Sequence, residues 1–350
     1  MKILVIGNFA IDSFGTHIYD NLQILNYNVD KFEFLPNTYS YNNYIEFIVK
    51  KYYRSIYSLL INFNKFRIIR LKNFFKKIKI LQPDLIIVTH DYFWPAEIKK
   101  IKNITINSKI VLWFPDPISN FGKAYFLEAN YDFYFFKDIY IINKLKKFST
   151  KKIFYLPECF NPNKHYFNDP IKDNYLSDLS CIGNFHSWRS LCFTPLLHLY
   201  NMKFYGVNPS NWIKSSSLNN IFQGFTAYNQ KKAEIFCRSK INLNNLQYGE
   251  ILGQNVRLFE IAGSGGFQLI QYNESLDDLF INGEEIISYN STNDLIDKIN
   301  YYLTNEDERN KIISASKKRA LNEHTYIHRI NLLIETVFNN GVGFKSNLLK

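Results

Sequence analysis

Short apolar runs alternate with amphipathic stretches along the first half of the chain. Between the apolar runs, side chains recur at helical spacing, as in Phe14–Tyr27. Such repeated strand–helix units predict a parallel sheet covered on both faces. Buried strands are predicted at Lys2–Ile6, Val29–Phe34, Asp84–His90, Lys109–Phe114, Asp132–Phe136 and Lys151–Pro157.

The second half repeats this plan, and a helical tail starts near Thr292. Pro157–Asn174 has three prolines and little periodicity, which indicates a linker. We therefore predict an N-terminal domain (1–157), a linker (158–174), a C-terminal domain (175–330) and a final helix or tail (331–350). Strands of the second domain are predicted at Asp178–Gly183, Met202–Gly206, Lys240–Asn244, Gly266–Gln271 and Glu284–Tyr289.

Two Rossmann-like doubly wound domains of the α/β class would face each other across a cleft. In open parallel sheets, ligands bind outside the carboxyl ends of the strands. The cleft is therefore the expected place of function.

The net charge of +11 favours anionic partners such as phosphorylated small molecules, a membrane surface or nucleic acid. Part of this charge lies in Lys50–Lys79, which holds ten Lys/Arg and no acidic residue, with apolar residues at near-helical spacing. The pattern predicts a pair of basic helices. They would form either a solvated outer face or a peripheral contact with anionic lipid. No nucleic-acid-reading motif accompanies the charge, so nucleic acid is not an expected partner.

Four cysteines, none in a Cys-x-x-Cys pair or near clustered histidines, argue against a zinc site. So few cysteines in a chain of 350 residues indicate reduced thiols and a cytoplasmic location. Within the cytoplasm, the protein could attach peripherally to the inner face of the membrane. The first apolar run ends at Gly7 and is typical of a strand, not a signal peptide. No apolar run approaches the roughly 18–20 residues of a spanning helix.

Gln254–Ile270 carries the most informative motif. Asn255 can cap a helix on which Arg257 and Glu260 lie one turn apart, and Gly-Ser-Gly-Gly leads into a strand. A carboxylate here could accept hydrogen bonds from a ribose, while an arginine and helix N–H groups suit a pyrophosphate. An ordinary ion pair beside a glycine turn is the alternative. The glycines do not form the nicotinamide fingerprint Gly-x-Gly-x-x-Gly.

This motif, written NVRLFEIAGSGGFQLI, resembles the C-terminal half of CgeB-type glycosyltransferases of the GT-B fold. The similarity continues through Asp-Leu, Gly-x-Glu and His-Thr-Tyr elements, and into KAEIFCRSKINLN (Lys232–Asn244) upstream. LPECFNPNKHYF (Leu156–Phe167) resembles the family's linker, and CIGNFHSWR (Cys181–Arg189) the first strand and loop of its nucleotide domain. In the first half, VLWFPDP (Val111–Pro117) is the best match.

The resemblance implies that Glu260 contacts the donor ribose and that Arg257 and Arg189 bind its diphosphate. Gly183 would allow close backbone approach at the mouth of its strand. Asn244 and Asn255 would line the same pocket. Related retaining families often have a second glutamate eight positions before the first. That position is Leu252 here, and the nearest acid is Glu250.

On the facing domain, Asp116 follows a predicted strand and is a candidate general base, with a turn aspartate before proline as the alternative. His90 also ends a strand, although a lone histidine there is more often structural. By the resemblance, Gly15 would bring a loop to the cleft. No Asp-x-Asp occurs in the chain, so a donor diphosphate held by arginines and helix N–H groups would need no metal.

The sequence thus predicts a metal- and cofactor-independent glycosyltransferase. Its donor would be a nucleotide diphosphate sugar, and its acceptor a glycan, a lipid-linked sugar or a protein, in surface polysaccharide or glycoconjugate synthesis. Two alternatives remain open. One is a nucleotide-sugar epimerase of the same fold, whose extra acid/base carboxylates are not evident. The other is a non-catalytic assembly protein that retains the fold.

Overall fold

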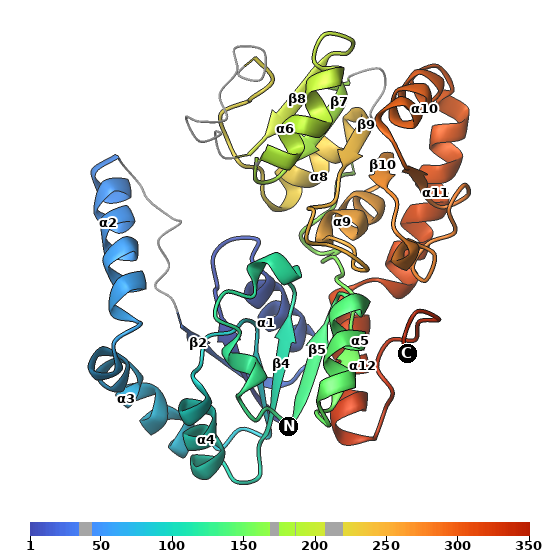
Figure 1. Ribbon diagram of the computed structural model, residues 1–350. Helices are drawn as coiled ribbons and strands as arrows, with labels where there is room; N and C mark the ends of the chain where they lie inside the picture. Colours follow the sequence, from blue (N-terminus) through green and yellow to red (C-terminus); the bar gives the residue numbers. More distant parts are fainter. Residues whose placement is uncertain (35–43, 169–174, 186, 207–219) are drawn as a thin grey trace.

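The computed structural model describes residues 1–34, 44–168, 175–185, 187–206 and 220–350, which build two α/β domains in succession (Figure 1). Each strand overlaps one that the apolar pattern predicts. The last part of the predicted linker, 169–174, lies outside the described residues.

The N-terminal domain is built on a parallel sheet with the order β2-β1-β3-β4-β5-β6. Its strands alternate with helices, as the sequence predicts. The elements are β1 (Lys2–Gly7), α1 (Phe14–Ile24), β2 (Asn28–Glu33), α2 (Tyr44–Leu60), α3 (Asn64–Leu81), β3 (Leu85–Val88), α4 (Pro95–Ile104), β4 (Lys109–Phe114), β5 (Phe133–Phe136), α5 (Ile139–Phe148) and β6 (Ile153–Tyr155).

The C-terminal domain has a parallel sheet with the order β11-β10-β9-β7-β8. Helices cover both of its faces. The elements are β7 (Ser177–Ile182), α6 (Ser187–Phe193), β8 (Met202–Tyr205), α8 (Asn229–Cys237), β9 (Ser239–Asn244), α9 (Val256–Ser264), β10 (Gln268–Gln271), β11 (Ile287–Tyr289), α10 (Thr292–Thr304) and α11 (Glu306–Glu323).

In each sheet the first strand lies between the second and the third, so the chain winds outward in both directions from that point. In the N-terminal domain the loops after β1 and β3 leave the sheet in opposite directions. In the C-terminal domain the loops after β7 and β9 do the same. Such a switch point leaves a crevice at the carboxyl ends of the strands, where ligands of α/β proteins bind.

Helix α12 (Tyr326–Phe338) returns the chain to the N-terminal domain. Its residues Tyr326, Ile330 and Leu333 are buried against the face of the first sheet that α1 also covers. The boundary predicted at residue 330 therefore lies inside a helix. This helix belongs to the N-terminal core, because its apolar stripe is complementary to that sheet face.

Candidate active site between the two domains

Two adjoining cavities lie between the carboxyl ends of the two sheets. A cavity of about 440 Å³ reaches from Asp116 and Lys137 of the N-terminal domain to Arg189 and Glu250 of the C-terminal domain. A cavity of about 310 Å³ lies beside Gly183, Tyr228 and Glu260, with Asp12 from the facing domain. Asn184, Val256 and Arg257 line both. Both volumes are in the range typical of small-molecule sites.

The guanidinium groups of Arg189 and Arg257 flank Gly183 at the mouth of β7. Gly183 has a φ of +137°, which L side chains rarely adopt, and a Cβ atom there would lie 2.7 Å from Nη1 of Arg257 and 2.9 Å from Nη1 of Arg189. A side chain at this position would therefore strain the backbone and displace the two guanidinium groups. Arg189 is 2% exposed; its Nε donates to Asn245 Oδ1 at 3.0 Å and its Nη1 to the Asn184 carbonyl. Burial, and then the charge of Arg257, lowers the pKa of Arg189 to about 10.

Neither arginine forms an ion pair within the part of the chain that the structure describes. Nε of Arg257 is also buried without a hydrogen-bond partner there. Arg189 is a buried cation without a carboxylate partner among the described residues, and the half-buried Arg257 beside it adds repulsion. Both costs fall when an anion joins the two guanidinium groups. The arrangement therefore favours an anionic ligand at Gly183.

Helix α9 starts at the same place. The Asn255 side chain caps it by accepting from the N–H of Leu258 at 3.2 Å, and Asn255 Nδ2 in turn donates to Asn244 Oδ1 at 2.7 Å. Helix N-termini favour negative charge. Asn244 is fully buried and lines neither cavity, so its part is to hold the cap residue.

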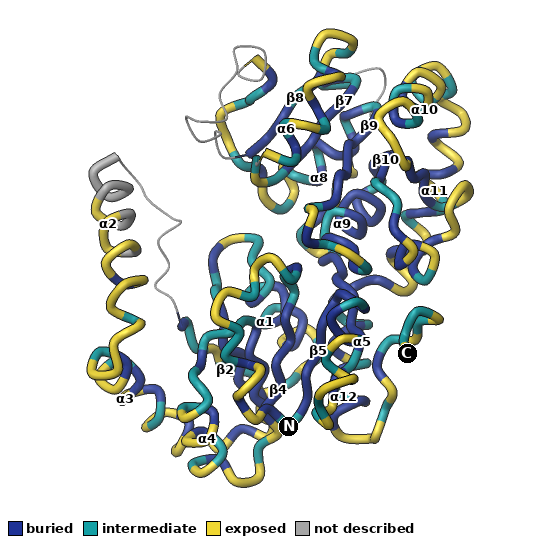
Figure 2. Tube along the Cα trace, in the orientation of Figure 1, coloured by how far each residue is buried: buried dark blue, intermediate teal, exposed yellow. Residues whose placement is uncertain are grey.

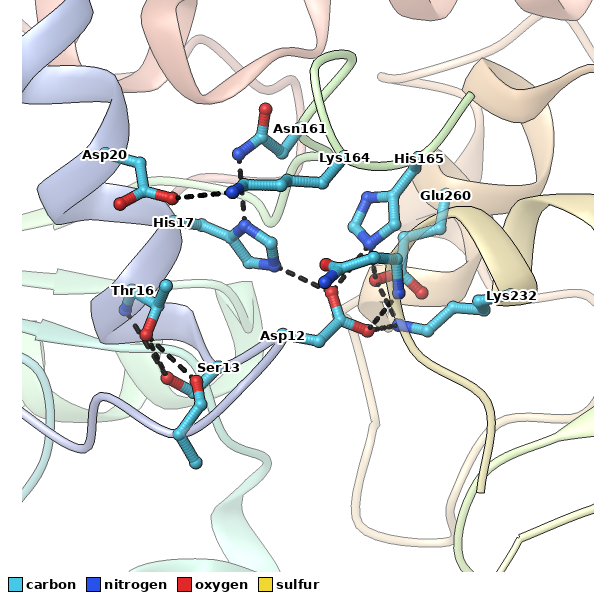
Figure 3. A network of polar contacts seen from close by, with 12 residues as sticks. Asp12, Ser13, Thr16, His17, Asp20, Asn161, Lys164, His165, Lys232 and Glu260 are labelled. Carbon is cyan, nitrogen blue, oxygen red and sulfur yellow. Dashed lines mark hydrogen bonds and ion pairs between the residues drawn. The ribbon is translucent and has the colours of Figure 1, made fainter. Parts of the chain in front are cut away.

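Glu260 belongs to a buried network that joins both domains and the linker (Figure 3). Its Oε1 lies 2.8 Å from Lys232 Nζ, which also binds Asp12 Oδ2 at 2.5 Å. Asp12 Oδ1 lies 2.9 Å from His17 Nε2 and 2.7 Å from His165 Nε2. Burial alone would raise the pKa of Asp12, but the hydrogen bonds of His165 and His17 and the charge of Lys232 hold it well below its usual range.

Asp12, His17 and His165 lie close enough together to hold a metal ion. However, Asn161 Oδ1 accepts from the N–H of Asn163, which turns Asn161 Nδ2 toward His17 Nδ1 at 3.1 Å. His17 Nδ1 is then an acceptor, so its Nε2 carries the proton and donates to Asp12. A ligating nitrogen needs a free lone pair. The hydrogen bonds of His17 therefore favour a hydrogen-bonded network over a metal centre. In this network only His165 Nδ1 of the two rings lacks a partner among the described residues.

A second cluster that bridges the domains lies on the wall of the 440 Å³ cavity. Lys137, which follows β5, lies 2.9 Å from Glu250 Oε1 and 3.5 Å from Glu158 Oε1. Glu250 Oε2 is buried and has no hydrogen-bond partner among the described residues. Burial raises the pKa of Glu158 to about 8 despite the charge of Lys137.

We expect Glu158→Gln to raise the melting temperature at about pH 8 more than at about pH 5. A carboxyl whose folded-state pKa of about 8 exceeds its unfolded value of 4.5 costs stability as the pH rises between these values. At about 1.4 kcal/mol per pKa unit, the amide removes a free-energy difference of at most about 5 kcal/mol across this window. Thermal unfolding of both proteins over the pH range measures it. The exposed control Glu284→Gln should unfold like wild type, and parallel profiles for Glu158→Gln and wild type would contradict the assignment.

Asp116 and His90 meet because β3 and β4 are neighbours, so the residues after them emerge side by side. His90 Nε2 lies 3.4 Å from Asp116 Oδ2, and the two side chains are 35% and 40% exposed. Burial raises the pKa of Asp116, but the hydrogen bond and charge of His90 outweigh it, so the pKa is lowered and the carboxylate is ionised at neutral pH.

Gly15 does not contribute to either cavity. It lies in the first turn of α1, where a Cβ atom would be 2.5 Å from the Asn8 carbonyl oxygen. The residue is therefore glycine because the helix packs closely against the end of β1. From the same loop, it is Asp12 that lines the 310 Å³ cavity.

Leu252 occupies the position where related families often have their second glutamate, and here this position belongs to the contact between the domains. The N–H groups of Ile251 and Leu252 donate to the Asp138 carboxylate at 3.0 and 3.2 Å, which fixes this loop on the N-terminal domain. Leu252 then packs against the core of that domain. Glu250, two residues earlier, faces the 440 Å³ cavity instead.

The structure therefore brings eight predicted residues to the interdomain site or its support, and places Gly15 in helix packing. Sequence reasoning missed Asp12, Lys137, Glu158, His165 and Lys232. A signal existed for three of them, because Asp12, Lys137 and Glu158 follow buried strands at the ends that face the cleft. No signal in the sequence singled out Lys232, which lies within a helix.

Residues 189–335 match the model of a protein family described as glycosyl transferase-like. This segment contains Arg189, Lys232, Glu250, Arg257 and Glu260. The predicted relationship to glycosyltransferases is confirmed at this level. No curated protein matches the chain.

Several solved structures share the fold over nearly the whole chain. A glycosyltransferase from Rickettsia africae is 15% identical with a TM-score of 0.63, covering 97% of this chain and 99% of that one. Sucrose-phosphate synthase from Thermosynechococcus elongatus is 10% identical with a TM-score of 0.64, covering 97% and 100%. Anabaena HepE in complex with UDP-glucose is 12% identical with a TM-score of 0.61, covering 97% and 100%. This likeness confirms the predicted GT-B fold.

Proposed function

We propose that this chain is a glycosyltransferase that takes its sugar from a nucleotide diphosphate donor bound to the C-terminal domain. The observation that carries the proposal is the pair of arginines at Gly183, of which Arg189 is buried and Arg257 half-buried, and which form no ion pair within the described residues. A diphosphate there would accept hydrogen bonds from both guanidinium groups and face the N-terminus of α9.

The two cavities suit the two ends of such a donor. The nucleoside would occupy the 310 Å³ cavity, where the Glu260 carboxylate can accept hydrogen bonds from ribose hydroxyls and Tyr228 offers an aromatic face to the base. The sugar would extend into the 440 Å³ cavity, toward Asp116 and toward Glu250 Oε2, which has no hydrogen-bond partner among the described residues. The HepE complexes with UDP and UDP-glucose support a uridine nucleotide as the first donor to try.

In this arrangement Asp116 removes the proton from the attacking hydroxyl of the acceptor, and His90 orients its carboxylate. The arginines stabilise the charge that develops on the leaving diphosphate, a task that a divalent metal performs in other enzymes. Transfer is therefore proposed to be metal-independent. A CgeB-type enzyme acting on a glycan, a lipid-linked sugar or a protein in the cytoplasm is our proposed assignment.

Nucleotide binding tests the proposal directly. We expect UDP or another nucleoside diphosphate to raise the melting temperature by about 3 °C or more at saturation. Glu260→Gln should weaken this binding at least tenfold, since it removes the charged acceptor for the ribose. Glu284→Gln, an exposed change outside both cavities, is the matched control.

The outcomes separate the alternatives. Absence of any shift with UDP, GDP, ADP and CMP would overturn the proposal, and an unchanged affinity of Glu260→Gln would remove the ribose assignment. Binding without release of sugar from any donor would favour the assembly protein. Conversion of the bound nucleotide sugar to its epimer would favour the epimerase. Loss of turnover in a chelator would contradict metal independence.

A further inference from the structure

Helices α2 and α3, here called the basic arm (residues 44–81), project from the N-terminal domain (Figure 1). The end of α2 is attached through Tyr57, whose hydroxyl donates to the Phe34 carbonyl at 3.1 Å and accepts from Arg70 Nε at 3.0 Å. Helix α3 is attached through its buried residues Leu71, Phe74 and Ile78. The arm is therefore fixed along α3, while most of the described part of α2 is exposed (Figure 2).

One side of the exposed surface of α2 is apolar. Residues separated by three or four positions lie on one side of a helix, and here they form an unburied stripe. Tyr52 and Leu59 are each 66% exposed and Phe63 is 63% exposed. The stripe comprises Val49, Tyr52, Tyr53, Ile56, Leu59 and Leu60 of α2, and Phe63 of the turn before α3 continues it. An exposed apolar surface of this extent indicates a contact with a partner.

The charge of the arm indicates which partner. Between Lys50 and Lys79 there are ten Lys/Arg and no acidic residue. The side chains of Lys50, Lys51 and Arg54 lie outside the described residues. On α3, four exposed lysines share one side of the helix with Ile68 and Ile69, which are 60% and 73% exposed. These lysines are Lys65, Lys72, Lys76 and Lys79.

We propose that the basic arm docks this protein on an anionic lipid bilayer. The apolar stripe of α2 enters the boundary between headgroups and acyl chains, and the lysines of α3 bind anionic headgroups. A second copy of this chain would bring two acid-free, positively charged stretches together, which charge repulsion disfavours. No helix in the described part of the chain is long and apolar enough to cross a membrane, so the contact is peripheral.

Vesicle sedimentation of the full chain tests the proposal. We expect at least tenfold stronger binding to phosphatidylcholine vesicles with about one third phosphatidylglycerol than to phosphatidylcholine alone, and weaker binding at high salt. Two triple variants should each reduce it at least tenfold, because stable attachment needs both an apolar and an electrostatic contribution. They are Tyr52→Ser/Ile56→Ser/Leu59→Ser and Lys65→Gln/Lys72→Gln/Lys76→Gln.

Matched controls make the same exchanges at exposed positions outside the arm and should bind vesicles like wild type. They are Ile106→Ser/Phe148→Ser/Ile281→Ser and Lys99→Gln/Lys311→Gln/Lys318→Gln. Unchanged melting temperatures establish that all variants fold. Equal binding to neutral vesicles, or arm variants that sediment like their controls, would overturn the proposal. So would an apolar-stripe variant that turns a dimer into a monomer while vesicle binding persists. Nucleotide binding is measured separately, so failure here leaves the cleft assignment intact.

Discussion

Arg189→Met should lose at least about 100-fold in nucleotide affinity and yet melt about 2–5 °C higher than wild type without ligand. The guanidinium is 2% exposed and lies beside that of Arg257, with no ion pair among the described residues. Arg189→Met leaves Asn245 Oδ1 and the Asn184 carbonyl without this donor. We expect the relief of the desolvation of Arg189 and of its repulsion with Arg257 to outweigh this loss, because the methionine stem fills similar space. When a nucleotide binds, the positive charge of Arg189 attracts its negatively charged diphosphate. Thermal unfolding with and without UDP measures both effects.

Arg309→Met is the matched control, because Arg309 is equally buried but lies outside both cavities. Its Nη1 donates to the carbonyls of Tyr302 and Leu303, so its loss leaves these acceptors unpaired. We expect a lower melting temperature and an unchanged shift with UDP. If Arg189→Met behaved in the same way as Arg309→Met, the Arg189 charge would be structural and the anion site would be withdrawn.

Asp116→Asn should lower kcat by about 100-fold or more while the KM for the donor stays near that of wild type. The carboxylate and the arginines line the same cavity from opposite domains. In the proposed mechanism the arginines hold the donor and Asp116 acts on the acceptor, so we expect Asp116 to contribute little to donor affinity. The amide cannot take the proton and no longer holds His90 as an ion pair. Steady-state kinetics with saturating donor separate the two parameters.

Asp178→Asn provides the comparison, since Asp178 is also a partly exposed aspartate paired with a basic residue, Lys240, but outside the cleft. It should leave kcat unchanged. His90→Gln should fall between the two, because Gln can hydrogen-bond the carboxylate without carrying charge. If Asp116→Asn raised the donor KM and spared kcat, Asp116 would be a sugar-binding residue, and the base would have to be sought elsewhere.

The strands and the order of domains follow from the sequence because each rests on local information. Continuous apolar runs such as Lys109–Phe114 have the length of strands that are buried on both faces. Because the strands are parallel, the polar residues that follow them in sequence lie at the same edge of the sheet. That rule alone is enough to bring His90 and Asp116 together. The Asn255 cap and the helix that carries Arg257 and Glu260 are equally local.

The partners of these residues could not be predicted, because they depend on how two separately folded sheets meet. Lys232 binds Asp12 and Glu260, which are more than two hundred residues apart in sequence. Glu158 has a raised pKa because the packed domains bury it, and no neighbour in the sequence reveals this. The membership of Leu252 in the N-terminal core likewise depends on the Asp138 contact across the interface.

Helix α12 has a consequence for how the chain reaches its native state during synthesis. One face of the first sheet is completed by Tyr326, Ile330 and Leu333, which the ribosome adds only after the whole second sheet. Until then Ile3, Val5 and Trp113 lack part of their cover and expose apolar surface. The second domain, whose strands and helices are contiguous in sequence, can fold first. A nascent chain stalled before residue 326 should therefore bind chaperones through its earliest-made domain.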